Sequence, residues 1–226
     1  NKNLRLAINY GIDRKKMMKY LRNNIGYPAN KGFIPTGLSE NINTIGFEYN
    51  FEKSKKFLID YQNETGKKII NLELSTDANY IDIVEFLQRE LLEIGINIKI
   101  NIMPPSALRQ AKSNGKLQLF RASWIADYPD AENYLSLFYS KNKAPNGPNY
   151  THFENLIFDK NYLKSYKEQS TDLRNQIYSE LDQMIINEAP IIPLYYDKVM
   201  RFSKKNVHGI KSNPVNQLNL KRVYKK

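Results

Sequence analysis

Cysteine is absent from this chain of 226 residues. The absence excludes disulfide bonds, thiolate nucleophiles and thiolate metal sites, and it permits an oxidising location without demonstrating one. Histidine is scarce: His152 and His208 lie far apart and lack the spacing of a metal-binding pair. We expect both histidines in surface loops, and we expect neither a metal nor a cofactor.

Long apolar runs are also missing. No stretch approaches the roughly 18–20 apolar residues that cross a bilayer. The first residues carry charges where a signal peptide has its apolar core, although this excludes little if the sequence begins inside a longer gene product. GxGxxG, GxxxxGK[ST] and GxSxG motifs are absent as well. The usual signatures of nucleotide binding and of serine hydrolases are therefore lacking.

Acidic residues are outnumbered, 23 against 34 lysines and arginines, which gives a formal net charge of +11. Such an excess invites a nucleic-acid interpretation. The basic residues are scattered, however, generally beside acids or at amphipathic positions, and no aromatic-and-basic signature of a nucleic-acid fold accompanies them. We interpret them as a solvated lysine-rich surface and keep nucleic-acid binding only as a third hypothesis.

The apolar residues that are present alternate in ways that predict an α/β fold. Residues 68–74 and 96–102 alternate as strands, and residues 79–95 carry an apolar helical face that ends at Gly95. A strand, a helix and a strand at this spacing predict a crossover with parallel strands. Residues 116–124 are expected to add a third strand to the same sheet.

Further helices and strands are predicted around this unit, in one α/β domain without a flexible linker. Helices are expected over residues 1–22, over 50–62 with Asn50 as N-cap, over 105–115 and over 171–187. Residues 191–196 are expected to form a strand that 198–202 extend, and 140–152 to form a loop.

The stretch RASWIADYPDAENYLSLF, residues 121–138, carries the candidate site. It holds the only tryptophan, Trp124, beside Asp127, and DYPD breaks the strand at its carboxyl end, where open α/β sheets place ligands. An aspartate beside a tryptophan suits an ammonium group, and Arg121 offers a planar fork for a carboxylate. A ligand with both charges is a peptide or an amino acid. Asp127 and Asp130 also allow an acid/base pair, although carboxylates three residues apart are commonplace.

Five segments resemble, in order, motifs of the family 5 extracellular solute-binding proteins of ABC transporters, the dipeptide- and oligopeptide-binding proteins. LRLAINYGIDRKKMM resembles R-x-A-x-x-x-x-I-D-R, and YNFEKSKKFL resembles Y-x-x-x-x-A-K-x-L-L with Ser54 replacing alanine. WIADYPDAENYLSLF resembles W-x-x-D-Y-x-D-P-x-x-F-L, with Ala131 where proline is common. FENLI and APIIPLYY match the later motifs.

The resemblance implies a fold and a domain layout. Members are two-lobed clamps of the class II periplasmic-binding-protein type, more than twice this length. Residues 1–203 would then be the second, C-terminal ligand-binding lobe, and residues 204–226 a closing segment that returns to the first, missing lobe.

The resemblance also implies a role and site residues. The role is capture of short peptides outside the cytoplasmic membrane and delivery to ABC permease subunits, by a monomer without enzymatic activity. The location would be periplasmic or at the cell surface, with a lipid anchor left open. In peptide-binding members, the aspartate at the position of Asp127 pairs with the ligand's α-amino group, and some oligopeptide binders use the position of Arg121 for the carboxylate. Further pocket-lining candidates are Trp124, Tyr128, Tyr195 and Tyr196.

Two alternatives stay open at this point. The family also contains binders of nickel, haem and sugars, so the ligand class is not decided. From another class, a secreted hydrolase of peptides or glycans would use Asp127 and Asp130 as its carboxylates.

Overall fold

A three-stranded parallel sheet organises one side of the molecule in this computed structural model, which describes residues 1–38, 42–213 and 216–226. Strand β2 (Ile70–Thr76) lies in the middle, between β3 (Ile96–Ile102) and the two-residue β4 (Leu119–Phe120). Strands β2 and β3 pair along their whole length, from Ile70 opposite Ile96 to Thr76 opposite Ile102. The predicted parallel crossover is confirmed.

The connection between β2 and β3 is a 3₁₀ turn (Ala78–Tyr80) followed by helix α4 (Ile81–Glu93). The helix buries the apolar face that its periodicity predicts, with Ile83, Val84, Leu87 and Leu91 inside. Gly95 follows at φ +92°, a left-handed conformation that lets the chain turn directly into β3. Helix α5 (Pro105–Ser113) follows β3.

The N-terminal residues form two helices, where the sequence pattern predicts one. Helix α1 (Lys2–Gly11) and helix α2 (Arg14–Leu21) are separated by Ile12 and Asp13, both with extended backbone. A new helix begins after Asp13, because the Asp13 side chain accepts the backbone N–H of Lys16 and caps α2. Helix α3 (Phe51–Thr65) begins after Asn50, which caps it as predicted.

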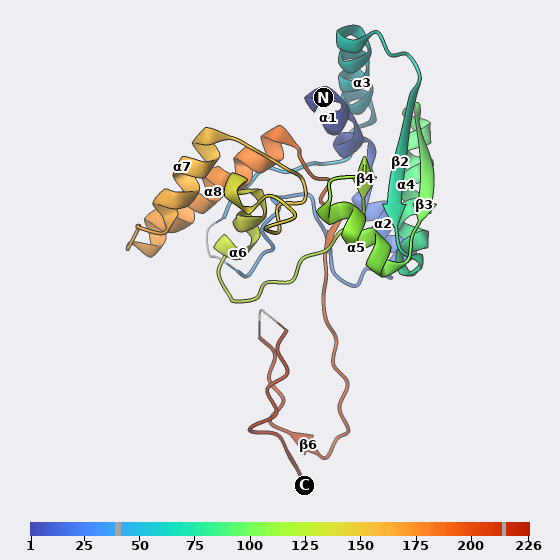
Figure 1. Ribbon diagram of the computed structural model, residues 1–226. Coiled ribbons are helices and arrows are strands. Elements are labelled where there is room, and N and C mark those ends of the chain that lie inside the picture. Colours follow the sequence, from blue (N-terminus) through green and yellow to red (C-terminus); the bar gives the residue numbers. More distant parts are fainter. Residues whose placement is uncertain (39–41, 214–215) are drawn as a thin grey trace.

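A second, helical layer lies beside the sheet layer, as Figure 1 shows on its left side. It consists of the short helix α6 (Glu132–Leu135), helix α7 (Leu156–Ser165) and helix α8 (Thr171–Glu188). These helices enclose their own apolar cluster, in which Leu135, Phe158, Leu181 and Ile185 are fully buried. The sheet, α1, α2, α3 and α4 enclose a separate one. Helix α7 was not expected from the sequence.

Three side chains from the first fifteen residues tie the N-terminal helices to the chain after α8. Arg5 donates to the carbonyls of Glu188 and Ala189. Asn9 donates to the carbonyl of Ile191 at 3.0 Å, and Arg14 donates to that of Pro193. The two ends of the layered body are therefore joined directly.

Two predicted strands are much shorter than expected. Strand β4 holds only two of the nine residues from 116 to 124: Leu119 and Phe120 pair with Leu74 and Ser75, and β2 ends one residue later, at Thr76. The expected strand over 191–202 is reduced to β5 (Tyr195–Tyr196), which pairs antiparallel with β1 (Tyr27–Pro28). Residues 197–203 form no strand.

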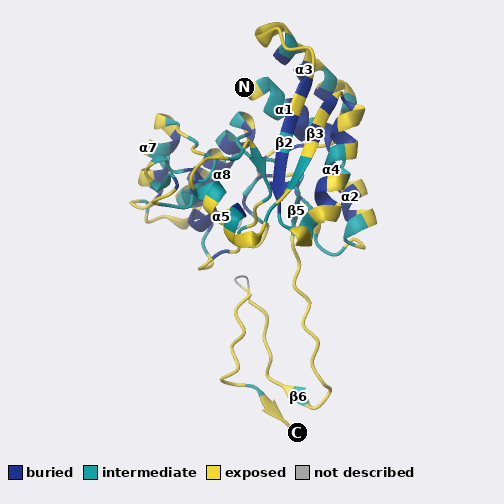
Figure 2. Cartoon of the chain, turned by 45° about the vertical axis from the view of Figure 1, so that its right-hand side comes forward, coloured by how far each residue is buried: buried dark blue, intermediate teal, exposed yellow. Residues whose placement is uncertain are grey.

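Beyond Tyr196 the chain leaves the body as a long, exposed arm (Figure 2). Within this arm, β6 (Val207–His208) pairs antiparallel with β7 (Tyr224–Lys225). Residues 214 and 215 of the expected closing segment lie outside the described residues. No helix among those described has the length and apolar character needed to cross a membrane.

Candidate functional site

The candidate segment begins where the sheet ends. The backbone N–H of Arg121 donates to the Ser75 carbonyl at 2.9 Å, which is the last sheet hydrogen bond before residues 122–130 turn away. The strand expected over 116–124 therefore ends before Trp124, since residues 121–124 are not in a strand. As predicted, β3 and β4 belong to one sheet, and β4 is its edge strand.

Arg121 is held by an aromatic ring. The centre of its guanidinium group lies 3.3 Å from the centroid of the Tyr80 ring, and Nη1 lies 3.3 Å from Oγ of Ser123. Stacking on a ring orients the planar group and leaves its edge as the part that can bind a carboxylate. The half-buried Lys112 of α5 is close enough to Arg121 that burial and this second cation together lower the pKa of the lysine.

Trp124 and Asp127 share one hydrogen-bond acceptor. The Trp124 indole donates to Oδ1 of Asn133 at 2.7 Å, and the backbone N–H of Asp127 donates to the same oxygen at 3.2 Å. Nδ2 of Asn133 lies 3.5 Å from Oδ2 of Asp127. Asn133 is buried whereas Asp127 is exposed. Asn133 therefore contacts the indole and Asp127 from the protein interior, and Asp127 faces solvent.

Tyr128 belongs to a group of tyrosines around one buried carboxylate. Glu132 accepts hydrogen bonds from the hydroxyls of Tyr128, Tyr162 and Tyr166. Burial, assisted by these bonds, raises the pKa of all three tyrosines, that of Tyr166 to about 12. The hydroxyls thus stay protonated and fasten the segment to α7.

Asp130 is engaged in local structure. One of its oxygens accepts the backbone N–H of Glu132 at 2.9 Å, and the other lies 3.6 Å from the guanidinium of Arg174 on α8. Burial is the main cause that raises the pKa of Tyr178, and the hydrogen bond of this tyrosine with Asp130 raises it further. These contacts hold the turn after Asp127 to helix α8.

Tyr195 and Tyr196 make their contacts in other parts of the fold. The guanidinium of Arg22 lies 5.0 Å from the centroid of the Tyr195 ring. The hydroxyl of Tyr196 donates to the carbonyl of Gly32, and burial raises the pKa of this tyrosine. The contacts of these two residues do not join them to the segment 121–130.

Two pockets in the described part of the chain lie away from the candidate segment. One has a volume of about 180 Å³ and the other about 230 Å³. The first is lined by Asp13, Arg14, Lys15, Asn30, Phe47, Glu48 and Tyr49. The second is lined by residues within 31–37 and 42–44 and by Asp182. Neither of these two pockets is lined by any of the six predicted site residues.

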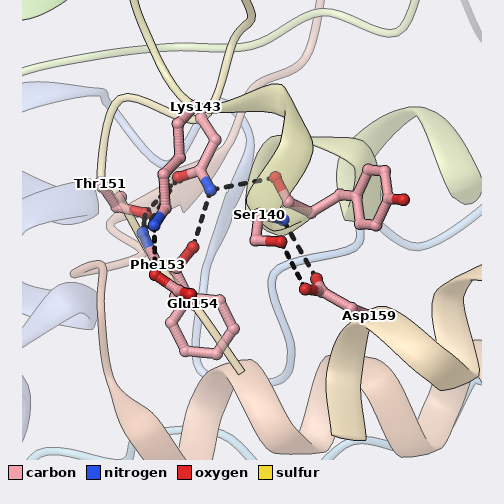
Figure 3. Close-up of polar contacts among 8 residues, drawn as sticks. Ser140, Lys143, Thr151, Phe153, Glu154 and Asp159 are labelled. Carbon is pink, nitrogen blue, oxygen red and sulfur yellow. Dashed lines mark hydrogen bonds and ion pairs between the residues drawn. The ribbon is translucent and has the colours of Figure 1, made fainter. Parts of the chain in front are cut away.

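The loop 140–153 bridges the helical layer and α5. Figure 3 shows its anchors: the Ser140 hydroxyl and backbone N–H both donate to the Asp159 carboxylate, and Lys143 pairs with Glu154. At the far side, Nζ of Lys112 lies 5.7 Å from the centroid of the Tyr150 ring. The loop therefore reaches the neighbourhood of Arg121 through Lys112.

Sequence reasoning missed Asn133 and assigned no role to Glu132. Both are buried in α6, directly after the DYPD turn. The signal that was available is their polarity: two adjacent polar residues precede the apolar Tyr134 and Leu135 in a short helix that is buried throughout. Buried polar groups need partners, and here the partners are the site residues.

Comparisons with known proteins come from three directions. Residues 1–146 match the family model described as bacterial extracellular solute-binding proteins, family 5 Middle. The dipeptide-binding protein DppE of Bacillus subtilis is 26% identical over an alignment of 232 positions. The alignment covers 98% of this chain and 42% of that protein. The chain thus spans less than half the length of the curated relatives it matches.

Solved structures share the fold. OppA of Burkholderia pseudomallei superposes with a TM-score of 0.85 at 18% identity, over all of this chain and 46% of that one. The periplasmic binding protein DppA of Helicobacter pylori, solved with the peptide STSA, gives 0.82 at 24% identity and 44% coverage of that chain. The α/β architecture predicted from the sequence is confirmed, and it matches part of each of these longer chains.

Proposed function

Because this chain belongs to family 5 of the bacterial extracellular solute-binding proteins, we propose that it provides the second lobe of a protein that captures short peptides for an ABC importer. The observation that carries the proposal is the arrangement at Asn133, which holds the exposed Asp127 beside the indole of Trp124. A carboxylate next to an aromatic ring attracts an ammonium group by charge and by the ring face. The ligand's α-amino group is the proposed occupant.

The carboxylate end of the peptide is assigned to Arg121. Its guanidinium, stacked on Tyr80, keeps a defined plane, and Lys112 adds positive charge nearby. Arg121 directly follows β4, at the carboxyl ends of β2 and β4, and Nζ of Lys112 lies 5.9 Å from the ring centroid of Phe120, the last residue of β4. Open α/β sheets bind ligands at this edge. Tyr128 is proposed to line the pocket beside Asp127, and Tyr195 and Tyr196 further away.

The remaining parts of the proposal concern the whole protein. Residues 1–203 act as the second lobe, and residues 204–226 return to the first lobe, which supplies the other wall of the site. Capture occurs outside the cytoplasmic membrane, and permease subunits receive the peptide. The names of the relatives, which include dipeptide-, oligopeptide- and glutathione-binding proteins, favour a peptide over nickel, haem or a sugar.

A hydrolase using Asp127 and Asp130 finds less support. The Asp130 carboxylate is engaged by the Glu132 backbone and by Arg174. An acid/base pair needs two carboxylates that both reach the substrate. The relatives named above are binding proteins.

Substitution of Asp127 by asparagine tests the proposal. In a protein that contains both lobes, Asp127→Asn removes the charge and keeps the shape. Affinity for peptides with a free amino terminus should fall by about ten- to a hundredfold, since a buried hydrogen bond to a charged group contributes roughly 1.5–3 kcal/mol. Titration calorimetry measures the change.

The control is the same peptide with an acetylated amino terminus. Its affinity should hardly change between the wild type and Asp127→Asn. Asp130→Asn serves as a matched variant, three residues away: it removes a charge but keeps an oxygen that accepts the Glu132 N–H, so it should leave the preference for free amines in place. Equal affinity of the wild type and Asp127→Asn for free peptides would refute the amine-anchor role. Release of hydrolysis products would favour the enzyme instead.

A further inference from the structure

Asn133 has both ends of its carboxamide directed at proposed binding residues. Its side chain belongs to a residue only 4% exposed, in helix α6. Oδ1 accepts the indole N–H of Trp124 and the backbone N–H of Asp127, at 2.7 and 3.2 Å. Nδ2 lies 3.5 Å from the Asp127 carboxylate. A group with this pattern controls where the ring and the acid stand relative to each other.

The short helix that carries Asn133 is itself anchored on both sides. Glu132 accepts the hydroxyls of Tyr162 and Tyr166 from the α7 side. Asp130 accepts the Glu132 N–H and lies 3.6 Å from Arg174 of α8. The hydroxyl of Tyr134 donates to the Trp124 carbonyl at 3.1 Å, which adds a backbone connection to the same segment. Asn133 therefore stands on a fixed base.

We propose that Asn133 is the positioning residue of the amine site, which sets the Asp127 carboxylate and the Trp124 indole in one arrangement before a ligand arrives. This inference rests on the proposed function. An exposed acid without such support would have to be ordered when the ligand binds, at a cost to affinity. With Asn133 in place, the ammonium group meets the charge and the ring together.

Substitution by leucine removes both polar functions at similar size. The probes are oligoalanines of two to five residues, each with a free and with an N-acetylated amino terminus, titrated calorimetrically into the two-lobed protein. The measured quantity is the ratio of the dissociation constants of the acetylated and the free peptide. We expect Asn133→Leu to lower this ratio about tenfold or more, because Asp127 loses its orientation while its charge remains.

Substitution by aspartate gives a signature that a merely structural residue would not produce. Asn133→Asp keeps an acceptor for Trp124 and for the Asp127 N–H, but it places a second carboxylate where the donor stood, 3.5 Å from Oδ2 of Asp127. Two carboxylates at this distance share a proton, so they titrate in two steps, of which the upper one lies above the pKa of a single carboxylate. As the pH falls, free-peptide binding should therefore weaken in two steps, the first of them about one unit or more above the single step of the wild type.

The other ionisable groups near Asp127 are accounted for in this comparison. Glu132 lies among the hydroxyls of three tyrosines, Tyr128 included, and Asp130 lies against Arg174. None of them changes between the wild type and Asn133→Asp, so the difference between the pH profiles of the two proteins reports on the new pair.

A stability control separates positioning from general loosening. Asn155 caps α7 through the N–H groups of Ile157 and Phe158, so Asn155→Ala weakens the fold without touching Asp127 or Trp124. This variant should keep the wild-type ratio.

The outcomes separate the proposed function from the role of Asn133. A wild type that binds no oligoalanine, or binds free and acetylated forms equally, defeats the proposed function. A wild type that discriminates, with Asn133→Leu discriminating equally well, overturns the role of Asn133 alone. If Asn133→Leu does not fold, Asn133→Asp decides, and a pH profile that coincides with the wild type overturns the inference.

Discussion

Among the individual residues, Glu132 and Asp182 are buried carboxylates held by hydrogen-bond donors. Glu132 takes its donors from tyrosine hydroxyls. Asp182, in α8, accepts the backbone N–H of Phe33 at 2.8 Å and the hydroxyl of Thr44 at 2.7 Å. Burial exceeds the effect of these bonds and raises the pKa of Asp182 from 3.8 to about 6. Its cost to the fold therefore depends on pH.

Asp182→Asn should change how stability depends on pH. The folded pKa is above the unfolded one, so between about pH 4 and about pH 6 the folded state holds a proton that the unfolded state has released. The wild type should lose stability as pH rises through that window, by roughly 2–3 kcal/mol, and no more above it. The introduced carboxamide does not titrate, so the variant should lack this part of the loss.

Urea unfolding of both proteins at several pH values measures the effect. The difference between the two curves is the informative quantity, because the contributions of the other carboxylates to the free energy of unfolding cancel in it. Curves that run parallel from about pH 4 to about pH 7 would show that Asp182 has an ordinary pKa in the folded state.

Among the elements, those with regular apolar patterns were predictable. Residues 96–102 alternate and form β3 with those bounds, and Asn50 caps α3 as predicted. Helix α7 escaped notice because Leu156 and Ile157 at its start are exposed, so its apolar residues do not form one face. The strands predicted at 122–124 and 198–202 do not form, for a different reason. Their residues suit a strand, but no neighbouring strand pairs with them in the described chain.

The candidate site was predictable only in part, for a related reason. The break at DYPD shows that the chain turns after β4, and Trp124 and Asp127 attract attention by their chemistry. The role of Asn133 depends on a side chain reaching back six to nine residues, which no local pattern encodes. Likewise, Tyr196 reaches Gly32 only through the pairing of β5 with β1.

Arg14→Lys should weaken the connection between α2 and the segment after α8. The guanidinium donates to the carbonyls of Pro193, Asn9 and Ile12 and to the side chain of Asn9, and the residue is 2% exposed. A single ammonium group cannot span these acceptors. Buried carbonyls left without donors should cost roughly 2–4 kcal/mol of the free energy of unfolding.

Denaturant unfolding compares this variant with Arg22→Lys, in which a more exposed arginine bound to Asp197 at 2.9 Å is replaced. That change should cost less than about 1 kcal/mol, as surface ion pairs do. If the two variants proved equally stable, the fork of Arg14 would not be holding the segment.

For the whole molecule, the arm after Tyr196 is the least protected part. Phe202 is 91% exposed, and Leu218, Leu220 and Tyr224 are each more than half exposed. Apolar side chains displayed along one segment mark a surface that another part of a protein covers. This agrees with the proposed return of residues 204–226 to a first lobe.

Limited trypsin digestion should cut this chain first in the arm, at Lys198, Arg201, Lys204 or Lys205, and leave the layered body intact. These residues lie in exposed, irregular chain, where proteases act. Mass spectrometry of early fragments identifies the sites, and the remaining body should unfold at an unchanged temperature.

In the two-lobed protein the same bonds should be cut much more slowly, because the arm would be packed. Equal cleavage rates in both forms would argue against the closing-segment proposal, and early cuts in 31–38 or 140–148 would argue against the arm as the weakest part.

The bonds from Arg5, Asn9 and Arg14 to residues 188–193 bear on the order of events during synthesis. They join residues 179 to 184 positions apart. A ribosome adds roughly 5–20 residues per second, so helices α1 and α2 wait on the order of ten to forty seconds for these acceptors. Contacts of such high sequence separation also make folding slow. Over that interval the three side chains lack the acceptors they have in the folded chain, whereas the apolar faces of α1 and α2 can already pack on α3, α4 and the sheet. The layered body is therefore closed last by polar bonds, after its apolar cluster has formed.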